Sequence, residues 1–309
     1  MILRLTKNCI YLFLVVAAIS CNSIKNLESK PNNGWDTSTL QKGVVWKQRL
    51  GNYPLFNSNQ TINVVDIDLK KADVKLDWVN SKDKFQPVYK LIEGEEALVA
   101  INGTYPDRDS EGKWGSFFKR NDSIYQTIEY PKNHPLYWKT EGFISVDEKG
   151  EIDIRLGNKA LYEHIDIPNV MSSSPVIIQE GVPIGKYFVE GDYSQEELNK
   201  LHYEDQNRHQ GVRHPRTAIG LTKDNHLIMV VVDGRSEQAK GMSAKEVTTL
   251  LFDVFKCQKA LNLDGGGSST MWIKDQPYNG VVNYPTDNNK FDHEGCRNIS
   301  MALIIVPKE

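Results

Sequence analysis

The most informative segment of the chain is a glycine turn set between two short apolar runs: Ala260-Leu261-Asn262-Leu263-Asp264-Gly265-Gly266-Gly267-Ser268-Ser269-Thr270-Met271-Trp272-Ile273. Three consecutive glycines allow backbone conformations that are closed to other residues. Because apolar residues flank the turn tightly on both sides, we interpret it as a binding turn and not as a flexible linker. Such a turn can direct several backbone N–H groups at one anion.

The residue types of this turn favour phosphate as the anion. No Gly-Lys-Ser/Thr follows the glycines, and the G-x-G-x-x-G spacing of a dinucleotide site is missing, so neither common nucleotide loop is present. The hydroxyls that follow the glycines add further hydrogen-bond donors. We therefore predict a phosphate-binding set made of Asn262, Gly265, Gly266, Gly267, Ser268 and Ser269.

Outward from the turn, short β-rich runs dominate the chain. They lie at residues 62–69, 74–79, 97–101, 142–146, 176–179, 218–222, 226–232 and 300–306. Residues 227–232 are continuously apolar, which is typical of a central strand covered on both faces. Because most of these runs follow each other directly, we predict an α+β fold with a mixed, largely antiparallel sheet and few packed helices.

Two helix starts carry a Ser-x-x-Glu capping box. Ser243 and Glu246 precede apolar residues at helical spacing as far as Phe255, which predicts a helix packed on the sheet. Ser194 and Glu197 open a more polar helix that ends near residue 203. The charged stretch 205–214 is predicted to be an exposed loop.

The N-terminus has the outline of an export signal. Arg4 and Lys7 precede an apolar stretch at 9–19, and small residues lie just before Cys21. An apolar core of about ten residues is too short to cross a bilayer as a helix. Ala18-Ile19-Ser20-Cys21 resembles a lipobox, which predicts a signal peptide at 1–20 and lipidation of Cys21; the alternative is an ordinary signal peptide in which Cys21 is incidental.

This N-terminus sets the expected location and domain organisation. We expect a bacterial cell-envelope protein, lipid-anchored to the membrane on the periplasmic face or the cell surface. A tether at 21–34 would lead to a β-rich region at 35–95 and then to the main domain at 96–309. The sequence leaves open whether the β-rich region is a small subdomain or a set of leading strands.

Composition narrows the partners. The formal net charge is −3 and positive charge is not concentrated in a stripe, so we expect no nucleic-acid partner. Beyond the signal, two cysteines remain, Cys257 and Cys296. In an oxidising compartment they could form a disulfide, and otherwise they would be two separate buried thiols. Neither has the spacing of a metal ligand, and no cofactor motif is present.

Three arginines follow or precede apolar strands: Arg216, Arg235 and Arg297. A guanidinium can hold a phosphate or carboxylate through two parallel hydrogen bonds. Three such residues indicate an anionic ligand, although any single one could be a salt-bridged surface residue.

Acidic partners are available in Asp264, Asp233 and Glu246. Glycosyl transfer commonly uses two carboxyl groups that flank the anomeric carbon, so these three are the candidate catalytic residues. Each also has a structural interpretation. Asp233 could be a turn residue, Asp264 could brace its own glycine turn, and Glu246 could do no more than complete its capping box.

Together these residues resemble the phosphodiester glycosidase family over residues 101–306. The family's Asn-Leu-Asp-Gly-Gly-Gly-Ser-Ser-Thr-Met core is matched letter for letter by 262–271, and its first segment is matched loosely from Asn102 to Tyr105. The other segments follow in order at 215–220, 233–235, 241–246 and Arg297. The chain departs from the pattern at Thr104 and Tyr105, at Ser174, where glycine usually precedes the proline, and at His214.

The resemblance implies a hydrolase that releases a GlcNAc-like sugar from a sugar-1-phosphodiester on an envelope or host glycan. It implies that the glycine turn, Asn102 and the three arginines bind this phosphoglycan substrate. One alternative is a non-catalytic glycan-binding surface lipoprotein that keeps the family fold. Another is a divalent-metal phosphodiesterase that uses Asp233, Asp264 and His214 and cleaves the P–O bond.

Overall fold

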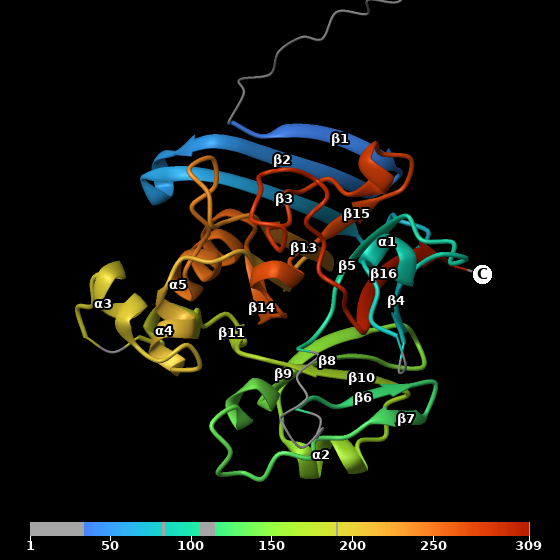
Figure 1. Cartoon of the computed structure of the whole chain (residues 1–309). Helices are drawn as coiled ribbons and strands as arrows, with labels where there is room; N and C mark the ends of the chain where they lie inside the picture. Colours follow the sequence, from blue (N-terminus) through green and yellow to red (C-terminus); the bar gives the residue numbers. More distant parts are fainter. Residues whose placement is uncertain (1–33, 82–83, 106–114, 190, 309) are drawn as a thin grey trace, which may run out of the picture. The chain divides into compact units, whose positions relative to one another are not determined.

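The computed structural model describes residues 34–81, 84–105, 115–189 and 191–308. The predicted signal peptide, Cys21 and the predicted tether as far as residue 33 lie outside these residues. The described chain forms three sheets, and Figure 1 shows short helices in the segments that connect their strands. Every pair of neighbouring strands among the described residues is antiparallel, which confirms the predicted α+β fold.

The largest sheet has seven strands in the order β1-β2-β3-β13-β12-β14-β11. Their bounds are β1 (Asp36–Gln41), β2 (Val44–Tyr53), β3 (Ser58–Asp68), β13 (His226–Val232), β12 (Arg216–Thr222), β14 (Cys257–Asn262) and β11 (Val176–Ile178). Strand β13 lies between β3 and β12, and its residues from Leu227 to Val232 are buried. The apolar run 227–232 is therefore the central strand that its sequence predicts.

Two smaller sheets complete the described fold. The four-stranded sheet has the order β15-β5-β16-β4, with β15 (Met271–Ile273), β5 (Val99–Asn102), β16 (Met301–Pro307) and β4 (Val74–Asn80). The five-stranded sheet has the order β7-β6-β10-β8-β9, with β7 (Ser123–Gln126), β6 (Phe118–Arg120), β10 (Asn169–Ser173), β8 (Gly142–Val146) and β9 (Ile152–Leu156). One apolar core joins the three sheets, because Leu261, Leu303 and Met171 belong to the same buried cluster.

The helices are short. They are α1 (Val88–Leu91), α2 (Lys159–His164), α3 (Gln195–Lys200), α4 (Gln206–Gly211) and α5 (Ala244–Thr249), which continues into a π-helical turn η4 (Leu250–Val254). Single 3-10 turns lie at η1 (Pro54–Phe56), η2 (Tyr137–Thr140), η3 (Ile184–Tyr187), η5 (Gly266–Ser268) and η6 (Tyr278–Gly280). Both predicted capping boxes are present, at Ser243 and Ser194. Helix α5 packs Val247 into a buried cluster with β13, as the apolar spacing predicts.

The expectation of an exposed loop at 205–214 is wrong. Asp205 caps a helix there, because its carboxylate accepts a hydrogen bond from the backbone N–H of Arg208 at 3.1 Å. Gln210 and Gly211 are buried in this helix. A Cβ at Gly211 would lie 2.6 Å from the Leu198 side chain, so the glycine lets α4 pack tightly on α3.

The early strands share sheets with the late ones. Residues Ile62 to Asp68 of strand β3 pair with the whole of β13, and β4 pairs with β16 from Val74 to Asn80. The region at 35–95 therefore supplies leading strands to sheets that later segments complete. Within the described ranges, none of the helices has the length and apolarity needed to cross a membrane.

Candidate active site

The glycine turn lies between the beginning of β12 and the end of β5. Strand β14 pairs with β12, with Asn262 opposite Ala218, and so delivers the turn to this point. Backbone bonds then fix it: Asp264 N donates to Gly103 O at 3.1 Å, and Gly266 N donates to Pro215 O at 2.9 Å. Gly266 has φ of +61°, a left-handed conformation that favours glycine.

The glycines also make room for charged groups. A Cβ at Gly266 would lie 2.9 Å from Nη2 of Arg235. A Cβ at Gly267 would overlap the carboxylate of Asp287 and lie 2.6 Å from Nη2 of Arg297. The turn is therefore in close contact with two guanidinium groups, which any larger residue at these positions would displace.

Beside the turn lies a cavity of about 120 Å³, several times the 10–15 Å³ or so that one water needs. Asp264, Gly265 and Gly266 form part of its wall. Among the described residues, five cationic side chains line it, Lys139, Arg208, Arg216, Arg235 and Arg297, against two carboxylates, Glu204 and Asp264. The excess of three positive charges suits an anionic ligand.

Arg216 is 2% exposed and forms the buried wall of the cavity. Its Nε donates to Met242 O at 2.9 Å, and its Nη2 donates to His209 O at 2.6 Å and to Val212 O at 3.1 Å. Burial lowers the pKa of Arg216 to about 10, so it stays charged at neutral pH. Nη1 is the nitrogen of this guanidinium that has no protein partner in the part of the chain described, and it remains for a ligand.

The other two predicted arginines line the same cavity. Arg297 forms a bidentate pair with Asp287, with Nε–Oδ2 at 2.9 Å and Nη2–Oδ1 at 2.7 Å. This pair raises the pKa of Arg297. Arg235 is exposed and has its guanidinium close to Gly266. The structure therefore brings Arg216, Arg235 and Arg297 together with the turn.

Two histidines in the cavity wall are neutral at physiological pH. Burial, reinforced by Arg216 and then Arg235, lowers the pKa of His214 to about 3. Burial also lowers the pKa of His209 well below its ordinary value, with Arg216 the next cause. Both line the cavity as uncharged imidazoles. They can donate or accept a hydrogen bond without adding positive charge.

Asp264 is half-buried and lines the cavity, and its backbone is held from two sides. Its carbonyl accepts from Asn102 Nδ2 at 2.7 Å. The Oδ1 of Asn102 in turn accepts from Thr217 Oγ1 at 2.7 Å and from the backbone N–H of Thr270 at 3.1 Å. Asn102 is therefore bonded to both ends of the turn and is not part of the cavity wall.

Asn262 is a second brace of this kind. Its Nδ2 donates to Leu263 O at 2.7 Å, to Tyr105 Oη at 3.1 Å and to Ser174 O at 3.2 Å. The sequence predicts that Asn102 and Asn262 contact substrate. In the structure both lie outside the cavity wall, and their amide groups form hydrogen bonds that position the turn.

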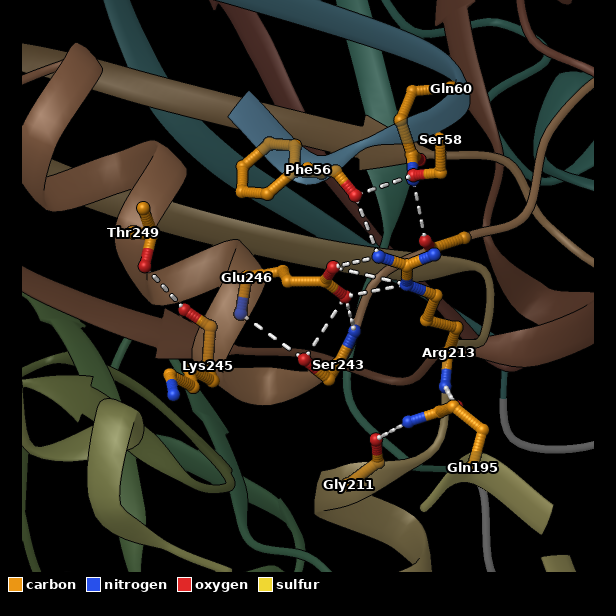
Figure 2. Close-up of polar contacts among 11 residues, drawn as sticks. Phe56, Ser58, Gln60, Gln195, Gly211, Arg213, Ser243, Lys245, Glu246 and Thr249 are labelled. Carbon is orange, nitrogen blue, oxygen red and sulfur yellow. Dashed lines mark hydrogen bonds and ion pairs between the residues drawn. The ribbon is translucent and has the colours of Figure 1, made fainter. Parts of the chain in front are cut away.

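Glu246 lies outside the cavity wall, in an ion pair with Arg213 (Figure 2). Its carboxylate accepts hydrogen bonds from Nε of Arg213, at 3.0 Å to Oε1 and 3.1 Å to Oε2. Oε1 also accepts a hydrogen bond from Nη2 of the same arginine. Oε2 accepts the backbone N–H of Ser243 at 2.9 Å, which completes the capping box. Arg213 Nη2 also donates to Phe56 O at 2.9 Å. The carboxylate predicted as catalytic thus ties the start of α5 to neighbouring segments.

Asp233 is 1% exposed and also lies outside the cavity wall. Its Oδ1 accepts from Asn283 Nδ2 at 2.7 Å and from the backbone N–H of Tyr284 at 3.0 Å. Burial raises the pKa of Asp233 to about 7. Its Oδ2 is buried without a hydrogen-bond partner in the described part of the chain.

The second half of the turn points away from the cavity. Gly267, Ser268 and Ser269 are buried and do not line it, and neither serine hydroxyl has a hydrogen-bond partner among the described residues. Of the predicted phosphate-binding set, the structure therefore places Gly265 and Gly266 in the cavity wall and the three residues after them behind it.

Cys257 and Cys296 are free thiols, so the disulfide alternative is wrong. Cys257 begins β14, whose six residues extend about 17 Å. Cys296 lies close enough to Thr270 and Asp233 for both to influence its pKa. Burial raises the pKa of Cys257 to about 12 and of Cys296 to about 11, which keeps both protonated.

Asp233, Asp264 and His214, the residues of the metal hypothesis, do not line the same cavity. Asp264 and His214 line the cavity, whereas Asp233 lies outside it. Across the ranges that the structure describes, no group of three or more His, Cys, Asp or Glu side chains is arranged to hold a metal ion.

Three charged cavity residues have no signal in the sequence: Lys139, Glu204 and Arg208. Lys139 comes from η2, and Glu204 and Arg208 come from the loop before α4 and from α4 itself. None of them lies in a recognisable motif, and tertiary folding alone brings them to the turn.

Two known proteins are similar in sequence to part of this chain. Over 108 residues, 30% of this chain and 17% of the other protein, the chain is 32% identical to the SPbeta prophage-derived uncharacterized protein YomE of Bacillus subtilis. Over 103 residues, 32% of this chain and 18% of the other protein, it is 38% identical to bovine N-acetylglucosamine-1-phosphodiester alpha-N-acetylglucosaminidase. The chain thus spans less than a fifth of the length of these two relatives.

Solved structures share the fold. The catalytic domain of the zebrafish N-acetylglucosamine-1-phosphodiester alpha-N-acetylglucosaminidase, auto-inhibited by pro-peptide, matches with a TM-score of 0.59 and 19% identity, over 91% of this chain and 85% of that chain. A putative exported protein of Burkholderia pseudomallei matches with a TM-score of 0.56 and 13% identity, over 88% and 96% of the two chains.

The matched range covers the turn and all the described residues that line the cavity. Residues 95–306 match the phosphodiester glycosidase family, and this range includes the glycine turn, its two asparagine braces and all seven charged cavity residues. The chain therefore belongs to the phosphodiester glycosidase family, a family of hydrolytic enzymes.

Proposed function

We propose that this protein hydrolyses a sugar-1-phosphodiester at the anomeric C–O bond. The observation that carries the proposal is that Arg216, Arg235 and Arg297 meet the glycine turn and Asp264 around one cavity. A phosphodiester carries one negative charge, and guanidinium groups bind its oxygens through paired hydrogen bonds. The net positive charge of the wall supports a substrate of this class.

The phosphodiester is bound by the turn and by the arginines next to it. Arg235 lies against Gly266 and Arg297 lies beside Gly267, so both guanidinium groups are close to the same stretch of backbone. Nη1 of Arg216 completes this group from the buried wall. As the anomeric C–O bond breaks, these donors stabilise the charge that develops on the leaving phosphate.

The leaving group sets what the carboxylates must do. A phosphodiester leaves as a phosphomonoester anion, so it needs less protonation than the alcohol of an ordinary glycoside. Charge stabilisation therefore provides most of the catalysis. Asp264, held at the entrance of the turn by Gly103 and Asn102, lies where a carboxylate can stabilise the positive charge that develops on the anomeric carbon.

The finer substrate assignment is a GlcNAc-like sugar on an envelope or host phosphoglycan. Its support is the name of the bovine relative, an N-acetylglucosamine-1-phosphodiester alpha-N-acetylglucosaminidase. We further propose that the mature protein is lipid-anchored in the bacterial cell envelope through Cys21. In growing cells, labelling with an alkyne fatty acid should mark the wild-type chain and leave Cys21→Ala unlabelled.

Products made in ¹⁸O-water test the reaction. The substrate is methyl phosphodiester of α-GlcNAc-1-phosphate, with and without a chelator. We expect free GlcNAc that carries ¹⁸O at its anomeric hydroxyl, and methyl phosphate without the label. GlcNAc-1-phosphate with ¹⁸O in the phosphate, formed only without chelator, would instead establish the metal phosphodiesterase. Binding of the substrate without any product over hours would establish a glycan-binding protein.

A further inference from the structure

In the part of the chain that the structure describes, two carboxylates line the cavity, and they come from separate parts of the fold. Asp264 follows β14, whereas Glu204 lies in the loop between α3 and α4. A glycosidase commonly needs one carboxyl group on each side of the anomeric carbon. Since Asp233 and Glu246 lie outside the cavity wall, Glu204 is the second carboxylate, among the residues described, that can reach a ligand bound there.

Glu204 is held in place by a buried lysine. Its Oε2 lies 3.2 Å from Nζ of Lys139, whose side chain is only 7% exposed. The side chain of Glu204 is 32% exposed, so one face of it is open to water. Apart from this ion-pair contact, Oε2 makes no hydrogen bond to any residue that the structure describes. Oε2 is buried beside this lysine, so Oε1 is the carboxylate oxygen that can accept a hydrogen bond from a water molecule in the cavity.

The groups near Glu204 differ from those near the turn. Lys139 Nζ lies 5.1 Å from the centre of the Tyr105 ring and 5.9 Å from that of Trp138. Tyr105 also lines the cavity, and its hydroxyl is fixed by a 2.9 Å hydrogen bond to Ser174 O. An aromatic ring suits the apolar face of a sugar, whereas Arg235 and Arg297 beside the glycines suit the phosphate. Glu204 thus belongs to the sugar end of the cavity.

We propose that Glu204 is the catalytic base that takes a proton from the water attacking the anomeric carbon. The proposal rests on the proposed function. The bond between the anomeric carbon and the phosphate oxygen breaks, and its electron pair stays on the phosphate. The water oxygen bonds to the anomeric carbon, and one water proton passes to the Glu204 carboxylate and then to solvent. Asp264 stabilises the developing positive charge during this step.

Replacement of Glu204 by glutamine is the central test. Glutamine keeps the size of the side chain but cannot accept the proton, so we expect kcat to fall about 100-fold or more. KM should stay within about threefold, since the arginines and the turn remain. Glu196→Gln is the matched control: Glu196 is an exposed glutamate in a surface ion pair with Lys200, 2.7 Å away, and its replacement should leave kcat unchanged.

Azide separates a base from a merely structural ion pair. Azide attacks the anomeric carbon without needing to lose a proton, so it should restore turnover in Glu204→Gln and yield a glycosyl azide. Lys139→Met breaks the same ion pair but keeps the carboxylate, and azide should not rescue it. If Glu204→Gln and Lys139→Met lose activity alike and azide rescues neither, Glu204 has a structural role and the proposal fails.

The outcomes distinguish this inference from the proposed function. If the wild-type protein releases no sugar from the phosphodiester, the proposed function itself is wrong. If the wild type releases sugar and Glu204→Gln does so at the same rate, only the role of Glu204 is wrong. Thermal melting shows whether Glu204→Gln is folded. If it is not, Glu204→Asp keeps the charge one methylene shorter, and its kcat should fall about tenfold.

Discussion

The glycine turn after β14 and the capped start of α5 each present an acidic residue in a recognisable sequence pattern, yet the two residues have different surroundings. Asp264 is held through its backbone by Gly103 and Asn102, and it lines a cavity rich in arginine. The carboxylate of Glu246 is occupied by Arg213 and Ser243. The Glu246 carboxylate thus stabilises the start of a helix, whereas Asp264 lines a cavity that a ligand can enter.

Asp264→Asn should have the largest effect and tests the first half of this comparison. Asparagine keeps the shape of the side chain, and the bonds that fix the turn are made by the backbone of this residue. The variant should therefore fold normally, while kcat falls about 10³-fold because the charge at the anomeric centre is lost. Sugar release and thermal melting are the two measurements. Unchanged turnover would show that Asp264 only shapes the turn.

Asp233→Asn tests a third acidic residue, whose carboxylate is buried outside the cavity wall. Burial raises its pKa to about 7, above the ordinary value of 3.8. Between these two pH values the folded protein holds a proton that the unfolded chain has released, so the free energy of unfolding falls as pH rises from about 4 to about 7. Asparagine does not ionise, so the substitution should remove this decrease in the free energy of unfolding, which is on the order of 4 kcal/mol.

Urea unfolding of wild type and Asp233→Asn at pH 4, 6 and 8 measures this difference. The variant should gain stability relative to the wild type as pH rises, and the gain should level off above about pH 7. A constant difference between the two proteins at every pH would mean that Asp233 is charged in the folded state. In that case it would be a candidate for chemistry alongside Asp264.

Gly267→Ala tests whether the third glycine makes room for the arginine at the cavity. A Cβ there would overlap the Asp287 carboxylate and crowd Arg297, and both would have to move. We expect KM for the phosphodiester to rise about tenfold, which corresponds to about 1.4 kcal/mol of binding. Gly150→Ala is a control outside the site, although its φ of +80° brings some strain of its own. Steady-state kinetics with an unchanged KM would contradict the contact.

The sequence predicts the fold and one side of the site well. Hydrophobic periodicity identifies β13, and both capping boxes form as predicted. The sequence does not predict strands β9 and β10, because their short and partly polar segments owe their conformation to neighbouring strands. The charged residues of α4 favour a loop, and no pattern in the sequence shows that Gln210 and Gly211 are buried.

There is a physical reason why the sequence does not predict the other side of the site. Glu204 and Lys139 are separated along the chain, and neither belongs to a motif, so only tertiary packing brings them to the cavity. The reverse error concerns Glu246. Its Ser-x-x-Glu pattern identifies the helix start correctly, but no pattern in the sequence reveals that Arg213 pairs with its carboxylate. Motifs thus locate acidic residues, whereas their partners come from the fold.

Glu246→Gln should have the smallest effect and tests the second half of the comparison. Glutamine can still complete the capping box, so the loss is confined to the charge in the pair with Arg213. Both side chains are partly exposed, at 17% and 29%, and solvent weakens the pair, so we expect stability to fall by about 1 kcal/mol. The values of kcat and KM should stay within about twofold of the wild type.

Arg213→Gln is the matched variant, because it removes the same pair from the other side and keeps Glu246. If the pair serves the fold, both variants should lose similar stability in urea unfolding, the arginine variant somewhat more because it also loses the bond to Phe56 O. Both should keep normal turnover. A 100-fold fall in kcat for Glu246→Gln alone, at unchanged stability, would place Glu246 with Asp264 and remove the distinction between the two regions.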